Sequence, residues 1–213
     1  MLPDWSRGHV LTHWARNAEG QTRMLRAAMH CAVAAQYPGG NAQREADIAT
    51  GAGRPARQIL TDVRAAIDQV EDTWRRMPAD AWDRPTGARV GRRPAWQSVW
   101  ARWRETEIHH VDLNAGYTHD RWPAEFVSLM LPRVLPTLRN RLAEDLTVRV
   151  QTDGQQWTRV GAPAAPSDDP VVVRGSAAAV LCWLVGRSVP AAADISATQS
   201  GRSRPLPSLR PWS

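Results

Sequence analysis

Apolar side chains recur at helical spacing through most of the first 144 residues, and the pattern changes abruptly after that point. Apolar residues three and four positions apart line one face of a helix, so they predict helices that pack together. Four segments carry this pattern: 5–36, 56–77, 94–113 and 123–144. Pro132 and Pro136 predict a kink or break in the last of them. Residues 1–144 are therefore expected to form a helical bundle.

The sequence also indicates where these helices begin and end and which side chains are buried. Asp4 or Ser6 is suited to cap the first helix, and Pro38-Gly39-Gly40 to end it. Residues 41–55 are expected to be a loop that starts with a short helix, and 79–93 a linker or short hairpin. The expected core includes Val10, Leu11, Trp14, Ala18, Met24, Leu25, Ala28, Val33, Ile59, Leu60, Val63, Ile67, Val70, Trp74, Trp96, Val99, Trp100, Trp103, Ile108 and Val111.

After residue 144 the pattern becomes that of strands. Alternating apolar residues predict strands at 146–150, 157–160 and 170–174, with a hairpin turn at Asp153-Gly154. Ser176 is expected to cap an apolar helix over 177–186. The prediction is an α+β fold, in which a small α+β domain at 145–190 follows the bundle and 191–213 forms a loop or disordered tail.

The composition of the chain bears on its binding partners and on where in the cell it is expected to lie. The net charge is +6, but all 27 basic residues are Arg and they are scattered among Asp and Glu, which disfavours a nucleic-acid partner. The absence of Lys, with many Ala, Pro and Gly, indicates genomic bias. No apolar run is long enough to span a membrane, and no signal peptide is visible. A cytoplasmic protein is expected, with Cys182 buried and inert.

Two of the expected helices carry metal-type ligands one turn apart. His9 and His13 lie on the first helix, and Glu105 and His109 on the third. Residues four apart share a helix face, so packing of these two helices would bring imidazoles against a carboxylate. A His/Glu/His set with an open position is typical of a catalytic zinc site.

Each of these candidate ligands also has a simpler explanation. A Glu and a His at this spacing are more often a solvated pair, but the third helix is expected to face the interior, where an unpaired Glu is costly. Asp112 is close enough to orient a ring nitrogen. His13 is a better candidate than His9, which lies in the first turn, and His110 points about 100° away from His109. Glu107 and His110 form half of a di-iron signature, but no second half exists.

Other catalytic motifs are missing from the sequence. It has no glycine-rich phosphate loop, no G-x-S-x-G elbow and no C-x-x-C pair. The nucleophile is therefore expected to be water or a thiol cofactor at the metal.

Two segments resemble the mycothiol-dependent maleylpyruvate isomerase family of DinB-like helical bundles. Residues 5–17, WSRGHVLTHWARN, are similar to its W-[ST]-x-x-H-[LV]-x-x-H-x-x-x-N segment, and residues 104–113, RETEIHHVDL, to its R-E-x-x-x-H-x-V-D-L segment. The resemblance implies that His13, Glu105 and His109 bind a divalent metal, usually zinc. It also implies mycothiol as cofactor.

The C-terminal part resembles the second domain of that family, an α+β unit likened to sterol carrier proteins. The stretch 169–176 and the pair Gly186-Arg187 match its strand–helix unit and its glycine–arginine pair. The resemblance implies a ligand-binding role for Arg187, which becomes the catalytic candidate. Family members carry a further helix before the Trp5 segment. Its absence here indicates either that the first bundle helix is missing or that the start codon is placed too late. In the first case a partner subunit, as in a homodimer, is expected to cover the apolar face of residues 10–33.

The resemblance implies a metal-dependent enzyme that adds a thiolate to an electrophilic small molecule, either as a maleylpyruvate cis-trans isomerase or as a thiol S-transferase. A non-catalytic or regulatory paralogue that keeps the fold and the metal is the alternative. The composition and the mycothiol family both suit an actinobacterium.

Overall fold

The computed structural model describes residue 2 and residues 4–87, 91–143, 146–153, 155–160, 169–189 and 194–211, with the backbone alone at 155–160. The chain forms two compact units, Met1–Gly116 and Tyr117–Ser213. The first is helical and the second combines helices with a sheet, which confirms the predicted α+β class. The boundary lies at 116/117 rather than at the expected 144/145, because the helix after it packs within the second unit.

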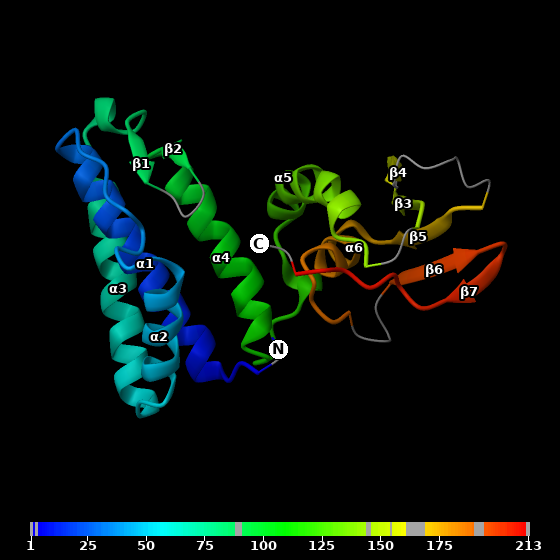
Figure 1. The fold of residues 1–213 in the computed structure, drawn as a ribbon, viewed down its shortest axis with the longest axis horizontal. Helices are drawn as coiled ribbons and strands as arrows, with labels where there is room; N and C mark the ends of the chain where they lie inside the picture. The colour runs from blue at the N-terminus through cyan, green and yellow to red at the C-terminus, as the bar shows by residue number, and fades with distance from the viewer. Residues whose placement is uncertain are drawn as a thin grey trace. The chain divides into compact units, whose positions relative to one another are not determined.

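The first unit is built around its first helix (Figure 1). Helix α1 (Arg7–Met29) contacts three others: α2 (Gly40–Ala52), α3 (Ala56–Arg76) and α4 (Gln97–Asp112). A short antiparallel hairpin, β1 (Pro85–Gly87) and β2 (Arg92–Pro94), joins α3 to α4. The expected linker or hairpin at 79–93 is thus a hairpin preceded by a 3₁₀ turn at Ala79–Ala81. The segment expected to be mostly loop, 41–55, is almost entirely helix α2.

Helix α1 begins where the sequence predicts and ends earlier. Ser6 caps it, with its hydroxyl accepting from the His9 backbone N–H while the His9 ring accepts from the Ser6 N–H. The helix stops at Met29 instead of residue 36, because Cys31 adopts a left-handed conformation at φ +56°. The chain then runs extended, and the Gln36 N–H donates to the Gly87 carbonyl at 3.1 Å. Pairing with the hairpin therefore replaces the last turns of the expected helix.

The core of the first unit lies mainly between α1 and α3. Small side chains on α1 let the helices approach closely, and branched side chains on α3 fill the interface. The buried apolar residues of the cluster are Ala15, Ala18, Leu25, Ala28, Ile59, Val63, Ala66, Val70, Met77, Ala81 and Ala95. The apolar residues of α1 in this cluster are thus buried within the chain. Val33 and Leu60 were expected in the core but are each 43% exposed.

Helix α4 presents its faces differently from the prediction. Trp96, Val99 and Trp100 were expected in the core, yet they are 42–45% exposed. The buried face carries polar side chains instead, including Arg102 and Asp112. The helix therefore turns its polar residues inward, and the apolar residues of its first turn face outward.

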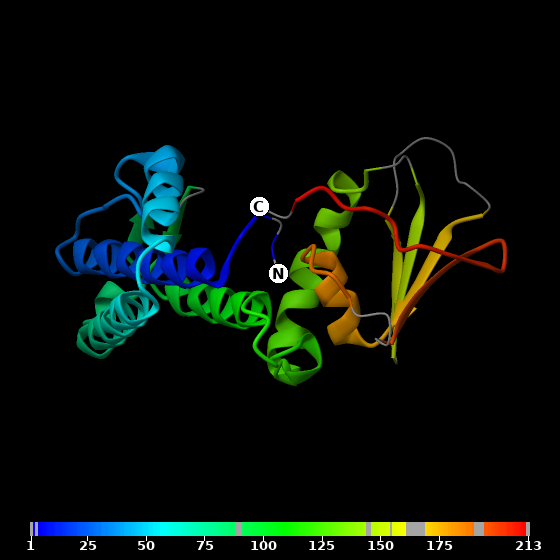
Figure 2. The same cartoon turned by 90° about the horizontal axis from the view of Figure 1, so that it is seen from below.

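The second unit places helices against a five-stranded sheet. Helix α5 (Ala124–Val134) continues into a 3₁₀ helix at Leu135–Asn140, so the predicted break occurs at Pro136. Helix α5 packs on α6 (Ala177–Leu184), and both lie on the same side of the sheet (Figure 2). Ser176 caps α6 as predicted, accepting from the Ala179 N–H at 3.3 Å.

The sheet has the order β4-β3-β5-β6-β7. The first three strands of this sheet along the chain are β3 (Val148–Thr152), β4 (Gln155–Val160) and β5 (Val171–Gly175), close to the three predicted positions. Strands β3 and β5 are parallel, and the other neighbours are antiparallel. Alternate residues of β3 and β5 are buried, namely Val148, Val150, Val171 and Val173. Gly154 of the expected hairpin turn and residues 161–168 lie outside the described residues.

The predicted loop or disordered tail at 191–213 is wrong over much of its length. Strands β6 (Ile195–Gln199) and β7 (Arg202–Arg204) form an antiparallel hairpin, and β6 pairs with β5. Ser200 and Gly201 connect them at φ +52° and +74°, the left-handed conformations of a tight hairpin turn. Polar strands concealed this pairing in the sequence, since only Ala197 is buried between them. Within the described residues, no helix is long and apolar enough to cross a membrane.

Candidate metal centre

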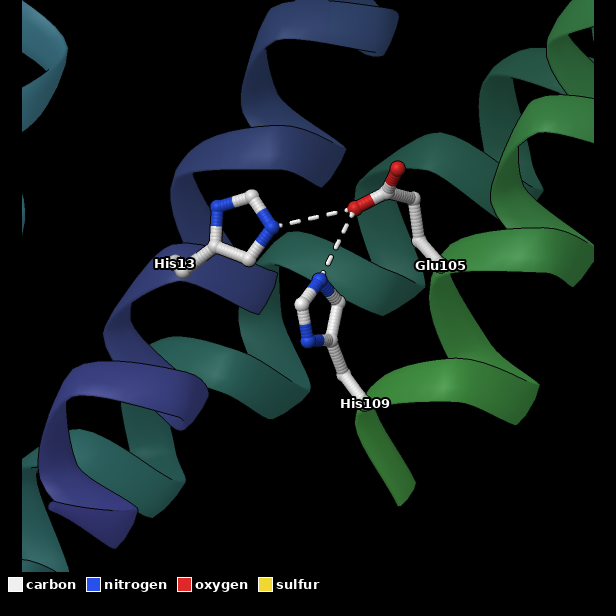
Figure 3. Close-up of side chains that lie close together, drawn as sticks. All are labelled: His13, Glu105 and His109. Atoms are coloured by element: carbon white, nitrogen blue, oxygen red, sulfur yellow. Dashed lines mark hydrogen bonds and ion pairs between the residues drawn. The ribbon is translucent and has the colours of Figure 1, made fainter. Parts of the chain in front are cut away.

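Helices α1 and α4 of the first unit bring three metal-binding side chains together (Figure 3). His13 Nε2 lies 3.0 Å from Glu105 Oε2, and His109 Nε2 lies 3.4 Å from the same oxygen. One ligand atom from each residue lies within 4.8 Å of the others, and no other His, Cys, Asp or Glu of the described chain joins the group. The one-turn spacing of Glu105 and His109 places both on the face of α4 toward α1.

Side chains that bind backbone carbonyls hold the two helices in this register. The Trp14 indole N–H donates to the carbonyl of Glu105 at 3.1 Å, and Arg102 donates to the carbonyl of Trp14 at 3.0 Å. At the other end of the contact, Arg7 donates to the carbonyls of Leu113 and Asn114, each at 2.8 Å. Burial lowers the pKa of Arg102 to about 10, so it stays charged at neutral pH.

Burial and neighbouring charges shift the pKa values of the three ligand residues in different directions. Burial lowers the pKa of His13, and the hydrogen bond and charge of Glu105 only partly offset this. Burial also disfavours the charged forms of Glu105 and His109, but hydrogen bonds and neighbouring charges outweigh its effect on their pKa values. Hydrogen bonds from both histidines hold the pKa of Glu105 well below its usual range, and Asp112 together with Glu105 raises the pKa of His109.

Further side chains orient the ligands from outside the cluster. Asp112 is buried, and its Oδ2 lies 2.8 Å from Nδ1 of His109. A carboxylate accepts, so Nδ1 carries a proton, and loss of the other proton from Nε2 would leave its lone pair for a metal. Arg104 donates to Oε1 of Glu105 at 3.0 Å, which leaves Oε2 for the cluster. The predicted orienting role of Asp112 agrees with this geometry.

The spacing of the donor atoms fits a divalent metal. Bonds of about 2.0–2.1 Å in a tetrahedron place neighbouring donor atoms about 3.3 Å apart. The two contacts to Glu105 Oε2, at 3.0 and 3.4 Å, bracket that value. Two imidazoles and one carboxylate supply three ligands, so a fourth position remains for an exchangeable group.

Comparisons with known proteins place this arrangement in a family. The model of the mycothiol maleylpyruvate isomerase N-terminal domain matches residues 1–114, and that of the family's C-terminal domain matches residues 121–204. The chain belongs to the mycothiol maleylpyruvate isomerase family. No curated protein matches it.

Two solved structures of this family are similar to the chain. One is the mycothiol-dependent maleylpyruvate isomerase, at 25% sequence identity and a TM-score of 0.83. The other is a histidine-to-alanine mutant of a mycothiol-dependent maleylpyruvate isomerase, at 24% identity and the same TM-score. Each match covers 99% of this chain and 83% of the other.

The remaining sequence candidates lie outside the cluster. His9 takes part in the N-terminal cap of α1, and the His110 ring lies 6.5 Å from that of Trp14. Glu107 accepts from the Trp103 indole at 3.1 Å. Arg187 lies in the second unit at the end of α6, where it donates to the carbonyl of Val185 at 2.8 Å. The metal-type ligands of this family member are thus provided by its first unit alone.

Sequence reasoning missed two neighbours of His13. Arg44 Nη2, from α2, lies 3.2 Å from Nδ1 of His13, and the Arg44 guanidinium lies 5.8 Å from the centre of the Tyr37 ring. The Trp5 and His13 rings meet edge to face, with their centres 5.7 Å apart. Trp5 stood in the family segment that the sequence presented, but Arg44 lies in a stretch expected to be mostly loop, so no pattern pointed to it.

Proposed function

We propose that this protein is a divalent-metal-dependent enzyme that uses mycothiol to isomerise maleylpyruvate. The observation that carries the proposal is the convergence of His13, Glu105 and His109 on one point with a fourth ligand position left open. Membership of the mycothiol maleylpyruvate isomerase family and the similarity to a mycothiol-dependent maleylpyruvate isomerase support the substrate and the cofactor.

The chemistry follows from what the open position would accept. When bound there, a divalent metal such as zinc would hold the mycothiol sulfur as a thiolate, whose reversible addition to the cis double bond allows rotation to the trans product. The thiol is released unchanged, so the reaction consumes no oxidant or second substrate.

The chain's own residues supply the binding and the orientation. His13, Glu105 and His109 would hold the metal, and Asp112 keeps the Nε2 lone pair of His109 aimed at it. Arg187 would bind a carboxylate of the substrate, because a guanidinium presents paired N–H donors that match a carboxylate.

Metal analysis of the wild type and of a His13→Ala variant tests the proposal. We expect about one divalent metal per chain in the wild type and far less in the variant. Purified wild type should then isomerise maleylpyruvate with mycothiol present and not without it. Unchanged metal content in the variant would disprove the site.

The chain offers a matched control for each histidine. His110→Ala, next to His109, should keep the metal and the activity, because His110 lies outside the cluster. His9→Ala should also keep the metal, although it removes part of the α1 cap. A protein that binds metal but shows no thiol-dependent isomerisation would instead be tested for transfer of the thiol to other electrophiles.

A further inference from the structure

A small pocket in the first unit lies beside the metal centre and shares none of its ligands. Its polar lining comes from one face of α1, from the loop after α1 and from α2: Arg16, Glu19, Arg23, Tyr37, Gln43 and Asp47. The volume of the pocket is about 140 Å³. Pockets for drug-sized ligands measure about 300–1,000 Å³, so this one has room for a single small ring.

The charges of this lining balance. Two guanidinium groups, of Arg16 and Arg23, are matched by two carboxylates, of Glu19 and Asp47. Ligand pockets are usually lined mostly by apolar side chains, whereas each of these four side chains presents charged hydrogen-bonding groups. A lining without net charge favours neither an anion nor a cation, and burying its polar groups under an apolar ligand would be costly. The expected ligand is therefore neutral and rich in hydrogen-bonding groups.

Bonds within the protein fix part of the lining and leave the rest for a ligand. Arg16 Nη2 lies 2.9 Å from Glu19 Oε1. Arg23 Nη1 donates to the carbonyl of Gln36 at 2.6 Å, and its other N–H groups have no acceptor among the described residues. Within the same part of the chain, the carboxylate of Asp47 forms no hydrogen bond or ion pair. The pocket thus holds an anchored donor and an acceptor that are both open to a ligand.

A ring with hydroxyl groups on neighbouring carbons matches this arrangement. Each hydroxyl both donates and accepts, so one can donate to Asp47 while its neighbour accepts from Arg23. The aromatic ring of Tyr37 provides a flat apolar surface for the C–H groups of such a ring. We propose that this pocket binds a neutral, polyhydroxylated six-membered ring.

Tyr37 connects the pocket to the metal centre. Its side chain hydrogen-bonds with that of Arg44, whose Nη2 lies 3.2 Å from Nδ1 of His13. Along α1, Arg16 lies about 5 Å and Arg23 about 15 Å beyond His13. A ligand in the pocket is therefore separated from the metal ligands by one layer of side chains.

A polyhydroxylated ring can reach this pocket from two sources. One is a free cyclitol or sugar. The other is mycothiol, whose cysteine is carried on an aminosugar joined to inositol. The second source rests on the proposed function, whereas the pocket and its polar lining stand without it.

Titration of the full-length protein with two polyols tests the pocket. The probes are myo-inositol and glucosaminyl-inositol, the part of mycothiol that lacks the cysteine. The chain has two tyrosines, and Tyr117 lies in the second unit, so tyrosine labelling gives one NMR reporter in the pocket and one control. The Tyr37 ring signal should shift and saturate, equally with a chelator present, while that of Tyr117 stays unchanged.

Two further probes test the chemistry of the ligand. Cyclohexanol, which has the ring but a single hydroxyl, should not bind, because it cannot contact the donor and the acceptor together. Inorganic phosphate should not bind either, because the lining has no net charge. The absence of a saturable Tyr37 shift with both polyols, or saturation by phosphate and by neither polyol, would overturn the proposal.

A matched pair of carboxylates on α2 assigns the binding. Asp47→Ala should weaken polyol binding about tenfold, since it removes a hydrogen bond to a charged acceptor. The variant should fold, because this exposed carboxylate has no partner within the described chain. Glu45→Ala, which removes an exposed carboxylate outside the lining, should bind as the wild type does. Equal polyol affinity of Asp47→Ala and the wild type would refute the site.

Affinity and kinetics separate the two sources of the ring. If the ligand is the cofactor, glucosaminyl-inositol should bind at least about tenfold more tightly than myo-inositol, and Asp47→Ala should raise the KM for mycothiol more than it lowers kcat. If it is a free polyol, myo-inositol should bind at least as tightly as glucosaminyl-inositol. Saturable polyol binding without isomerase activity would support the pocket and contradict only the proposed function. Isomerase activity without polyol binding would do the reverse.

Discussion

Asp112 accepts a hydrogen bond from Nδ1 of His109 at 2.8 Å, from a position three residues further along the same helix. The carboxylate is 1% exposed, so water does not compete for it. It fixes both the tautomer and the orientation of the imidazole, and it leaves Nε2 directed at Glu105. Among the described residues, no such acceptor lies at Nδ1 of His13, which faces Arg44 instead. The ring of His109 is therefore held in the tautomer that binds a metal through Nε2, whereas the ring of His13 is not.

Replacing Asp112 should weaken metal binding without removing a ligand. In Asp112→Ala, we expect zinc affinity to fall by about 10–100-fold, because the His109 ring loses the partner that orients it. Asp112→Asn keeps an acceptor oxygen and should fall less. Competition with a chromophoric chelator measures the affinities. Equal affinities of Asp112→Ala and wild type would show that the hydrogen bond has no role in metal binding.

Metal affinity should rise with pH through the titration of His109. The pKa of His109 is raised above its ordinary value of 6.5, so near pH 6.5 a proton still occupies the imidazole and competes with the metal. His13, with a lowered pKa, is already neutral there. Below the pKa of His109, affinity should decline by about tenfold per pH unit.

Calorimetry in buffers of different ionisation enthalpy tests whether the pH dependence of metal affinity comes from His109. At pH 6.5 the metal should release more than half a proton per wild-type chain from His109, because the pKa of His109 lies above 6.5. Asp112→Asn loses a negative charge that raises the pKa of His109, so it should release fewer protons and begin to bind metal at lower pH. Proton release that is the same in both proteins would assign the competition to another group.

The spacing of the ligands was the part of the site that the sequence predicted best. Glu105 and His109 share a helix face by local geometry alone, and the second histidine pair suggested which helix lies opposite. Arg44 was not predictable, since its contact with His13 depends on how α2 packs on α1. No periodicity in one segment carries that information.

The fold was predicted in class and in most of its elements, and the errors have physical causes. On α4, Ile108 is buried as predicted, but Trp96 and Trp100 face outward, because much of the buried face is polar and includes Arg102 and Asp112. A helix that supports a site departs from the usual amphipathic pattern. The hairpin of β6 and β7 was missed because its strands are polar, and because it joins the sheet through the pairing of β6 with β5, a strand distant in the sequence.

A matched pair of leucines tests the assignment of the core. Leu25 is fully buried between α1 and α3, whereas Leu60 is 43% exposed. We expect Leu25→Ala to lower the free energy of unfolding by about 2–5 kcal/mol, because it leaves a cavity in a close-packed interface. Leu60→Ala should cost under about 1 kcal/mol. Denaturant unfolding followed by circular dichroism gives both values. Similar losses of unfolding free energy in the two variants would contradict the burial of Leu25 and the exposure of Leu60.

Arg44 should oppose metal binding at His13. A guanidinium only donates, so the Nδ1 that faces it at 3.2 Å accepts, and the proton of the neutral ring then lies on Nε2, where it donates to Glu105. A metal at Nε2 requires the proton on Nδ1 and so breaks the contact with Arg44. We expect Arg44→Met to bind zinc about tenfold more tightly than the wild type, since it removes both a competing hydrogen bond and a positive charge. Arg44→Gln should bind at least as tightly, because its amide oxygen can accept from Nδ1, and Arg44→Lys should resemble the wild type. If Arg44→Met binds zinc more weakly, Arg44 supports the metal site rather than competing with it, and the order of the three variants in chelator competition distinguishes the two cases.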